Sequence, residues 1–371
     1  MKNLFETTTI NGMTLRNRFV RSATWEGMCE EDGRPTQKLV DCYRALARGG
    51  VGLIITGYTF VHIDGKQMPG SMGAQSDDFA QQAAALSAAV HDEGGKLCMQ
   101  LVHTGGQGRA KDGTRLLAPS AVATPQFSVL PSEMSLQDIE EVTDSFGSCA
   151  RRAKAWGFDA VQLHAAHGYL INQFLSPLTN QRTDSYGGSI ENRCRFLMEV
   201  YHRVRSTVGV SFPVLVKLNG SDFLEKGLEL DDAVYAAQAL DKKGIDAIEV
   251  SGGTPASKEK QPIRTKIETR EQEAYNLPLA ARIKAAVRCP VMVVGGFRSF
   301  DLIKSVLDKG EADYVSLARP FIREPELVRR WQAGDRSRAT CISCNGCYRP
   351  GLREGGIYCI VDKKEKKDTV S

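Results

Sequence analysis

Short apolar runs, many of them rich in β-branched residues, recur along the whole chain and end in glycine or polar residues. Such runs are typical of strands, and these are apolar enough to be buried on both faces of a sheet. There are eight: NRFVRSAT (17–24), VGLIITG (51–57), KLCMQLVH (96–103), DAVQLHAA (159–166), PVLVKLNG (213–220), DAIEVSGG (246–253), PVMVVGG (290–296) and DYVSLARP (313–320). The pattern therefore predicts eight strands.

Between these runs lie stretches whose apolar residues recur at helical spacing. The clearest cover residues 79–95, 135–157, 190–209 and 230–244. Ser135 and Asp138 form a capping-box opening for the second stretch, and Gly157 is placed to end it.

Eight strand and helix units in alternation favour a closed parallel barrel over an open sheet. A doubly wound sheet more often has five to seven strands and a glycine-rich first turn, and the chain contains no GxGxxG. The predicted fold is an α/β single domain, a (β/α)8 TIM barrel. The irregular stretches 104–134 and 168–188 follow the third and fourth strands, so they belong to the catalytic face.

Length and charge agree with this fold and exclude several classes of protein. The chain has 371 residues and a net charge of +4, and no stretch approaches the roughly 20 apolar residues of a membrane span. Its start, MKNLFETTTI, does not read as a secretory signal. We expect a cytoplasmic protein that binds neither membranes nor nucleic acid, because the basic run near the C-terminus is typical of a solvated tail.

Three polar side chains, His164, His167 and Tyr169, leave the fourth strand together. At the mouth of a barrel they can converge on one small ligand. Two imidazoles can donate to a single oxygen and stabilise negative charge on it, and the phenol can deliver a proton. Two alternatives stay open on spacing alone: buried histidines satisfied by the backbone, and a metal site.

The seventh and eighth strands end in residues suited to phosphate, namely Gly295 with Gly296 and Ala318 with Arg319. Barrels commonly bind phosphate there, since glycines allow backbone N–H groups to approach and arginine pairs bidentately. The glycines are equally consistent with simple turns.

Lys217 and Gln100 are polar residues within apolar runs. A lysine pointing into the barrel needs a negative partner, and a glutamine suits a ligand with several donors and acceptors. Either residue is also consistent with an internal polar network.

The stretch HAAHGYLINQFLSPLTNQRTDSYGGSIENR, residues 164–193, resembles the signature of the Old Yellow Enzyme family of flavin-dependent ene-reductases. Further agreement comes from the N-terminal LFETTTINGMTLRNRFVRSAT, from QLVHTGGQG at 100–108, from VMVVGGF at 291–297 and from YVSLARPFIREPEL at 314–327. The resemblance covers residues 1 to about 335 and implies a barrel that holds FMN non-covalently.

The resemblance also implies a role for each candidate residue. Phosphate would lie on Gly295, Gly296, Ala318 and Arg319, Lys217 would stabilise negative charge near flavin N1 and the C2 carbonyl, and Gln100 would bond the pyrimidine edge. Ser22, Ala23, Thr24 and Gly57 would line the flavin.

In the implied reaction, NADH or NADPH reduces FMN and departs, and an enone or enal then binds in its place. His164 and His167 hold the carbonyl oxygen while Tyr169 protonates the α-carbon. One pocket serves both substrates in turn, which accounts for the missing GxGxxG. The family further implies a homo-oligomer.

The chain departs from the family in SATWEG, which places Trp25 near flavin C4a and O4, where relatives often have Thr, Cys or His. We expect Trp25 to contact substrate and to affect both the redox potential and the pocket width.

A second departure is a cysteine-rich extension, residues 336–371, which follows the barrel assigned to residues 1–335 and ends in a basic tail. Cys341, Cys344, Cys347 and Cys359 are separated by two, two and eleven residues. They resemble the iron-sulfur ligands of 2,4-dienoyl-CoA reductases and trimethylamine dehydrogenase, which have one more residue between the second and third cysteines and continue into a Rossmann-type portion. A [4Fe-4S] cluster, zinc and no metal all stay open.

Three hypotheses follow. The first is an FMN-dependent ene-reductase. The second is a dienoyl-CoA-reductase-like flavoprotein that receives electrons through the cysteine site from a separate partner. The third is a barrel that binds flavin or phosphate only for storage or sensing.

Overall fold

Eight parallel strands form a closed ring in the computed structural model, which describes residues 3–108, 114–124, 126–127 and 129–368. They are β3 (Phe19–Arg21), β4 (Leu53–Ile55), β6 (Lys96–Val102), β9 (Ala160–Ala165), β10 (Val214–Asn219), β11 (Ala247–Ser251), β12 (Val291–Val294) and β13 (Tyr314–Leu317). Each lies within one of the eight predicted runs. The order is β4-β3-β13-β12-β11-β10-β9-β6, and pairing of β4 with β6 closes the ring. The (β/α)8 prediction is therefore confirmed.

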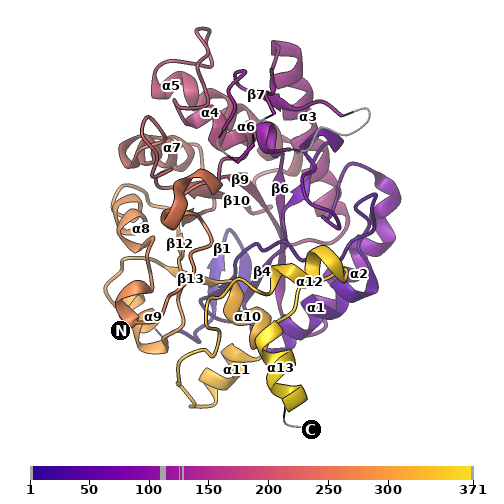
Figure 1. Ribbon diagram of the computed structural model, residues 1–371, viewed down its shortest axis with the longest axis vertical. Helices are drawn as coiled ribbons and strands as arrows, with labels where there is room; N and C mark the ends of the chain where they lie inside the picture. The colour runs from indigo at the N-terminus through magenta and orange to yellow at the C-terminus, as the bar shows by residue number, and fades with distance from the viewer. Residues whose placement is uncertain (1–2, 109–113, 125, 128, 369–371) are drawn as a thin grey trace.

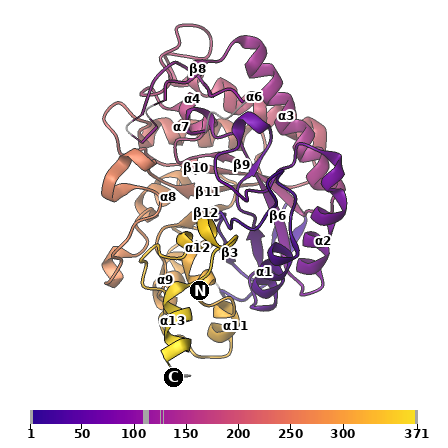
Figure 2. The ribbon, with the colours of Figure 1, turned by 45° about the vertical axis from the view of Figure 1, so that its right-hand side comes forward.

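Helices surround the ring (Figures 1 and 2). They are α1 (Gln37–Arg48), α2 (Ala80–His91), α3 (Leu136–Ala155), α4 (Leu170–Leu175), α5 (Ile190–Arg193), α6 (Arg195–Val208), α7 (Leu230–Lys242), α8 (Leu277–Lys284), α9 (Phe300–Asp308), α10 (Arg319–Arg323) and α11 (Leu327–Gln332). Of the four predicted helices, three match α2, α3 and α7. The fourth is divided at Cys194 into α5 and α6.

Shorter elements complete the barrel. They are the strands β1 (Thr8–Ile10), β2 (Met13–Leu15), β5 (Thr59–Phe60), β7 (Leu117–Ala118) and β8 (Ser132–Glu133), and the 3-10 turns η1 (Ile63–Gly65), η2 (Asp77–Phe79), η3 (Gly105–Gln107), η4 (Pro255–Lys260) and η5 (Arg270–Gln272). The β1–β2 hairpin turns at Asn11 and Gly12, both with positive φ, as a tight two-residue hairpin requires. Its apolar residues pack against the lower interior of the barrel.

The inward-facing side chains change character along each strand. Alternate residues of a strand point to the same face, so Ala160, Gln162 and His164 of β9 line the interior in turn. Leu215, Lys217 and Asn219 do so on β10, and Ala247, Glu249 and Ser251 on β11. The first residue of each series belongs to the apolar cluster that the hairpin seals. Polar groups therefore accumulate toward the carboxyl ends of the strands.

The C-terminal extension packs against the barrel through α12 (Tyr348–Arg353) and α13 (Ile360–Asp368), drawn in yellow in Figures 1 and 2. The backbone N–H of Ile357 donates to the carbonyl of Glu26, and Lys38 donates to the carbonyl of Gly355. The first two residues assigned to the barrel and the last three of the tail lie outside the described residues.

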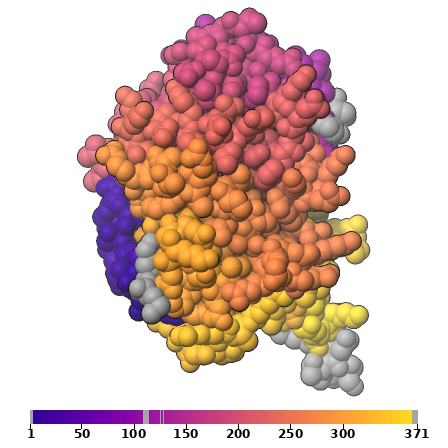
Figure 3. Space-filling view, turned by 90° about the vertical axis from the view of Figure 1, so that its left-hand side faces the viewer, coloured from indigo at the N-terminus to yellow at the C-terminus, as the bar shows by residue number. Residues whose placement is uncertain are grey.

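The two ends of the barrel sequence meet in space. Figure 3 shows the indigo N-terminal segment beside the orange segment near residue 300, and strand β3 pairs with β13 in parallel. Within the described part of the chain, no helix has both the length and the apolar composition that crossing a membrane requires.

The predicted capping box at the start of α3 is present: Ser135 Oγ accepts from the Asp138 N–H at 3.1 Å, and Asp138 accepts from the Ser135 N–H at 2.8 Å. Ser135→Ala should lower the free energy of unfolding by about 1 kcal/mol in urea titrations, because the helix start loses an acceptor. Ser145→Ala in the same helix is the control, since that hydroxyl only bonds back to the Glu141 carbonyl. Equal losses in both variants would contradict the capping role.

Candidate active site

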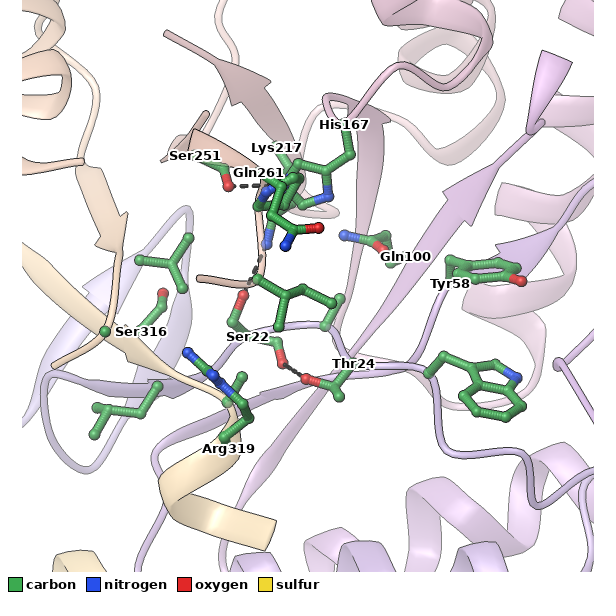
Figure 4. A pocket seen from close by; sticks show the side chains of 18 of the residues that line it. Ser22, Thr24, Tyr58, Gln100, His167, Lys217, Ser251, Gln261, Ser316 and Arg319 are labelled. Atoms are coloured by element: carbon green, nitrogen blue, oxygen red, sulfur yellow. Dashed lines mark hydrogen bonds between the residues drawn. The ribbon is translucent and has the colours of Figure 1, made fainter. Parts of the chain in front are cut away.

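A cavity of about 250 Å³ opens at the carboxyl ends of the strands (Figure 4). Twelve of the residues singled out from the sequence line it together: Ser22, Ala23, Thr24, Trp25, Gln100, His164, His167, Tyr169, Lys217, Gly296, Ala318 and Arg319. They lie on β6, β9 and β10 or just past the carboxyl ends of β3, β9, β12 and β13, far apart in the sequence. The ring closure is what brings them to one place.

Gly57 and Gly295 were also expected at the flavin, but neither is part of this lining. The Gly57 N–H donates to Tyr43 Oη at 3.1 Å and to Glu26 Oε1 at 3.2 Å, so it serves the packing between β4 and α1. The Gly295 carbonyl accepts from the Tyr275 N–H. Their contact with a flavin stays a prediction.

His164 and His167 lie edge to face, with ring centroids 5.1 Å apart. Burial is the main cause that lowers the pKa of each well below the usual value, and the Lys217 ammonium adds to it. Both rings are therefore neutral at pH 7. His164 Nδ1 accepts from the Ala166 N–H at 3.3 Å, which leaves the proton on Nε2. His167 Nε2 lies 2.7 Å from Ser251 Oγ; if that hydroxyl donates, His167 Nδ1 carries the proton.

The backbone of His167 is held in an unfavourable conformation. Its φ is 62°, in the left-handed region that non-glycine residues rarely adopt. Neighbouring amides hold it there: the His167 N–H donates to Asn219 Oδ1 at 3.2 Å, and Gln107 Nε2 donates to the His167 carbonyl at 3.0 Å. Such strain persists only where surrounding contacts determine it.

Tyr169 lies against the same histidine, with ring centroids of Tyr169 and His164 4.8 Å apart at 81°. Its hydroxyl donates to Gln67 Oε1 at 3.3 Å. Burial raises the pKa of Tyr169, so the phenol keeps its proton at neutral pH. The group is placed and protonated as a proton donor must be.

Lys217 has the negative partner that its burial requires. Its Nζ lies 3.2 Å from Glu249 Oε2 and 2.7 Å from Ser22 Oγ. Sequence reasoning missed Glu249 and Gln162, although each is a polar residue within an apolar run, the same signal that singled out Lys217 and Gln100. Burial is the largest single effect on the pKa of Glu249 and works to raise it, but the Lys217 charge and hydrogen bonds from Ser22, Ser316 and Lys217 together outweigh burial, so the pKa is lowered.

Arg319 joins the cavity to the C-terminal extension. Its Nη1 donates to Asn345 Oδ1 at 2.6 Å and to the Ser343 carbonyl at 3.3 Å. Tyr348 of α12 lines the cavity as well. The extension therefore forms part of the wall, a contribution that the sequence did not reveal because it depends on how the chain folds back.

Trp25 is fixed between a loop and the extension. Its indole N–H donates to the Pro69 carbonyl at 2.9 Å. A Cβ added at Gly351 would lie 2.7 Å from Trp25 Cζ3, so α12 packs directly on the ring. Trp25 lines the cavity, and its expected effects on pocket width and redox potential stay predictions.

The four cysteines of the extension border a second, small cavity. Cys341, Cys344, Cys347 and Cys359 all line it, beside Arg319. Burial is the main cause that raises the pKa of Cys347 to about 12. Among the residues described, no group of three or more His, Cys, Asp or Glu side chains is arranged to hold a metal ion.

The donor set of the main cavity fits FMN. The two cations Lys217 and Arg319 suit a ligand that carries negative charge at two places, and Ser22, Thr24 and Gln100 add neutral hydrogen-bonding groups between them. Gly296, with φ 74°, leaves no space for a side chain, because an added Cβ would lie 2.6 Å from Ile267 Cδ1. Arg319, at the start of α10, and Ser22 are both among the labelled side chains that line the cavity (Figure 4).

Another buried histidine, His103, follows β6, and its Nδ1 accepts from the Gly105 N–H at 3.1 Å. Burial lowers its pKa to about 3. Because the pKa of His103 is lower in the folded chain than in the unfolded chain, protons bind first to the unfolded chain as the pH falls. The contribution of neutral His103 to the free energy of unfolding is therefore complete above pH 6.5 and decreases below that pH.

His103→Asn keeps a side-chain acceptor but cannot titrate. Between pH 6 and 4, the free energy of unfolding should decrease with falling pH in both proteins. The slope of the wild type should exceed that of the variant by about 1.4 kcal/mol per pH unit. Urea titrations at several pH values measure this slope. The exposed His202→Asn is the control, and equal slopes for His103→Asn and the wild type would contradict the assignment.

Comparison with known proteins extends these observations. A family model described as NADH:flavin oxidoreductase / NADH oxidase family matches residues 3–337. The chain is 36% identical to an NADH oxidase of Thermoanaerobacter brockii, over 93% of this chain but 53% of that protein. It is 37% identical to an NADPH dehydrogenase of a Geobacillus species, over 94% of this chain and 98% of that protein. It thus spans about half the length of the first relative.

Two solved structures are similar over nearly the whole chain. A 2-naphthoyl-CoA reductase complex superposes with a TM-score of 0.89 at 28% identity, over 97% of this chain and 56% of that one. An old yellow enzyme homologue from Zymomonas mobilis superposes with a TM-score of 0.79 at 28% identity, over 95% of this chain and 98% of that one.

Proposed function

Since the chain belongs to the NADH:flavin oxidoreductase / NADH oxidase family, we propose that it is an FMN-dependent ene-reductase. It takes hydride from NADH or NADPH and reduces the C=C bond of α,β-unsaturated carbonyl compounds, with both substrates using one cavity in turn. The observation that carries the proposal is the convergence of two neutral imidazoles and a protonated phenol on that cavity.

The histidine pair polarises the substrate. His164 and His167 are neutral. His164 has its Nε2–H to offer to the carbonyl oxygen of an enone or enal, and His167 offers Nδ1–H when the Ser251 hydroxyl donates to its Nε2. Negative charge grows on this oxygen as the β-carbon accepts hydride. Two donors in a dry site stabilise that charge without reorganising, which is the usual source of a large rate enhancement.

Tyr169 completes the reduction from the other side. Its protonated phenol lies beside His164, so the two groups can serve the α-carbon and the carbonyl oxygen of one substrate. Neither imidazole is an acid at neutral pH, which leaves the phenol as the proton donor.

Lys217, Gln100, Ser22, Ala23, Thr24, Gly296, Ala318 and Arg319 would hold the flavin. Bound FMN would supply the hydride-transfer chemistry of the reaction. Lys217 places a positive charge at the floor of the cavity, and Arg319 offers donors suited to the phosphate at its rim.

Tyr169→Phe tests the assignment. Reduction of 2-cyclohexenone by the prereduced variant should slow by about a hundredfold or more, because a general acid commonly contributes that much. Reduction of the flavin by NAD(P)H should change little, since that half-reaction needs no proton from Tyr169. Stopped-flow spectroscopy separates the two rates.

Tyr235→Phe on helix α7 is the matched control and should behave like the wild type. An unchanged oxidative rate in Tyr169→Phe would remove the phenol from the mechanism. A colourless protein that takes up no FMN would overturn the proposal, and a flavin-loaded protein inert toward every enone would favour storage or sensing.

A second function is favoured by the extension. The superposition on the 2-naphthoyl-CoA reductase covers 97% of the chain at the higher TM-score, and the four cysteines border one cavity beside Arg319. On this basis we propose, as the alternative, a dienoyl-CoA-reductase-like flavoprotein in which Cys341, Cys344, Cys347 and Cys359 would hold a [4Fe-4S] cluster. Such a cluster would supply electron transfer from a separate partner. Zinc at the same cysteines would be structural.

Metal analysis of anaerobically purified protein distinguishes the two functions. The second requires about four irons per chain, because four thiolates hold one [4Fe-4S] cluster, and slow flavin reduction by NAD(P)H alone. Rapid bleaching by NAD(P)H in iron-free protein would rule it out.

We further infer that residues 1–335 form the FMN-binding unit and residues 336–371 an appended segment. A cytoplasmic location and a homo-oligomer are part of the same proposal, and size-exclusion chromatography tests the latter.

A further inference from the structure

A row of buried polar side chains crosses the barrel interior at the level of the cavity floor. Lys217 Nζ donates to Ser22 Oγ at 2.7 Å and to Glu249 Oε2 at 3.2 Å. The same carboxylate oxygen accepts from Gln162 Nε2 at 3.1 Å, and Gln162 Oε1 accepts from Gln100 Nε2 at 2.7 Å. All five side chains are at most 2% exposed.

Only part of this row reaches the cavity. Ser22, Gln100 and Lys217 line it, whereas Gln162 and Glu249 are not among its lining residues. The two are fully buried between neighbouring strands, at 0% exposure. Burial of the Glu249 carboxylate, which reaches neither solvent nor ligand, is unfavourable by itself. Its interactions with Lys217 and Gln162 must offset that cost.

The hydrogen bonds along the row have one possible direction. An ionised carboxylate only accepts, so Gln162 must turn its NH2 group toward Glu249. The carbonyl oxygen of Gln162 then faces Gln100, which must in turn donate its own NH2 group. The oxygen of Gln100 is left for the cavity. Without the carboxylate, both amides could reverse, and Gln100 would offer the cavity an NH2 group instead.

We propose that Glu249 and Gln162 are positioning residues that fix which end of the Gln100 amide faces the flavin and hold Lys217 beside it. The inference rests on the proposed function, in which the cavity holds FMN. The pyrimidine edge of an oxidised isoalloxazine carries one donor, the imide N–H, next to carbonyl oxygens. The Gln100 oxygen can accept from the imide N–H, and the Lys217 cation suits the carbonyl oxygens. With the Gln100 amide reversed, its NH2 group would face the imide N–H, and two donors would oppose each other.

Glu249 acts on the redox potential as well. Its negative charge lies 3.2 Å from the Lys217 ammonium and offsets part of the positive field at the cavity floor. Loss of the carboxylate charge would leave Lys217 free to favour the more negative, reduced flavin. The carboxylate therefore sets the potential lower than Lys217 alone would.

Glu249→Gln tests both effects in the full chain. After removal and readdition of flavin, the wild type should bind FMN about tenfold more tightly than 3-methyl-FMN, which lacks the imide N–H, since one hydrogen bond to a buried group is of this order. The variant should lose most of this preference. The preference for reduced over oxidised FMN should also be about tenfold greater in the variant than in the wild type. This change corresponds to a rise of about 30 mV in the two-electron midpoint potential.

The exchanged double variant Gln162→Glu with Glu249→Gln separates orientation from mere loss of a buried charge. It has the same composition and net charge as the wild type. A carboxylate at position 162 accepts from Gln100 directly, so the oxygen of Gln100 still faces the cavity, and the preference for FMN should return to within about threefold of the wild type. Glu273→Gln, a buried carboxylate that bonds the backbone of Arg298 and Ser299 elsewhere, is the control and should keep the full preference.

Two results would overturn the inference: a Glu249→Gln protein that keeps both the preference and the potential of the wild type, or a folded double variant that loses the preference. If Glu249→Gln does not fold, as judged by thermal unfolding, the double variant decides alone. A wild type that binds no FMN would overturn the proposed function itself. A wild type that reduces enones, with single and double variants alike unaffected, would overturn only this inference.

Discussion

The closure of the sheet into a ring is the constraint on which the rest of the molecule depends. Pairing of β4 with β6 joins the two edges that an open sheet would leave free. Every second residue of each strand must then point toward one axis. Polar side chains that are scattered over three hundred residues of sequence become neighbours, and several of them form hydrogen bonds with one another inside the ring.

The inward-facing side chains form successive levels along the strands. At the lower end, the β1–β2 hairpin seals an apolar cluster that includes Ala160, Leu215 and Ala247. One step further along the same strands, Gln162, Lys217 and Glu249 form a paired row. The next step brings His164 and Ser251 to the cavity. The apolar cluster thus lies below the row of polar and charged side chains, and that row lies below the groups that line the cavity, His164 and Ser251.

The loop that follows β9 has a strained backbone at His167. His167 adopts a left-handed backbone conformation that a histidine would not choose in isolation, and amides from three other segments hold it there. Asn219 accepts from its N–H, Gln107 donates to its carbonyl, and Asn172 accepts from the N–H of Gly168 at 2.6 Å. These hydrogen bonds hold the strained backbone in place, and both imidazoles line the cavity.

Sequence alone determined the strand count, the barrel, and the residues whose chemistry is unusual for their surroundings. His164, His167, Tyr169 and Lys217 could be found this way because a polar residue at the end of, or within, an apolar run is unfavourable there unless it has a partner. The tertiary structure decided the rest. It paired Lys217 with Glu249 and placed Tyr348 of the extension in the cavity wall. It also left Gly57 engaged with Tyr43 and Glu26. Such choices depend on strand stagger and on where the chain folds back, and local patterns carry no information about contacts between segments that are distant in the sequence.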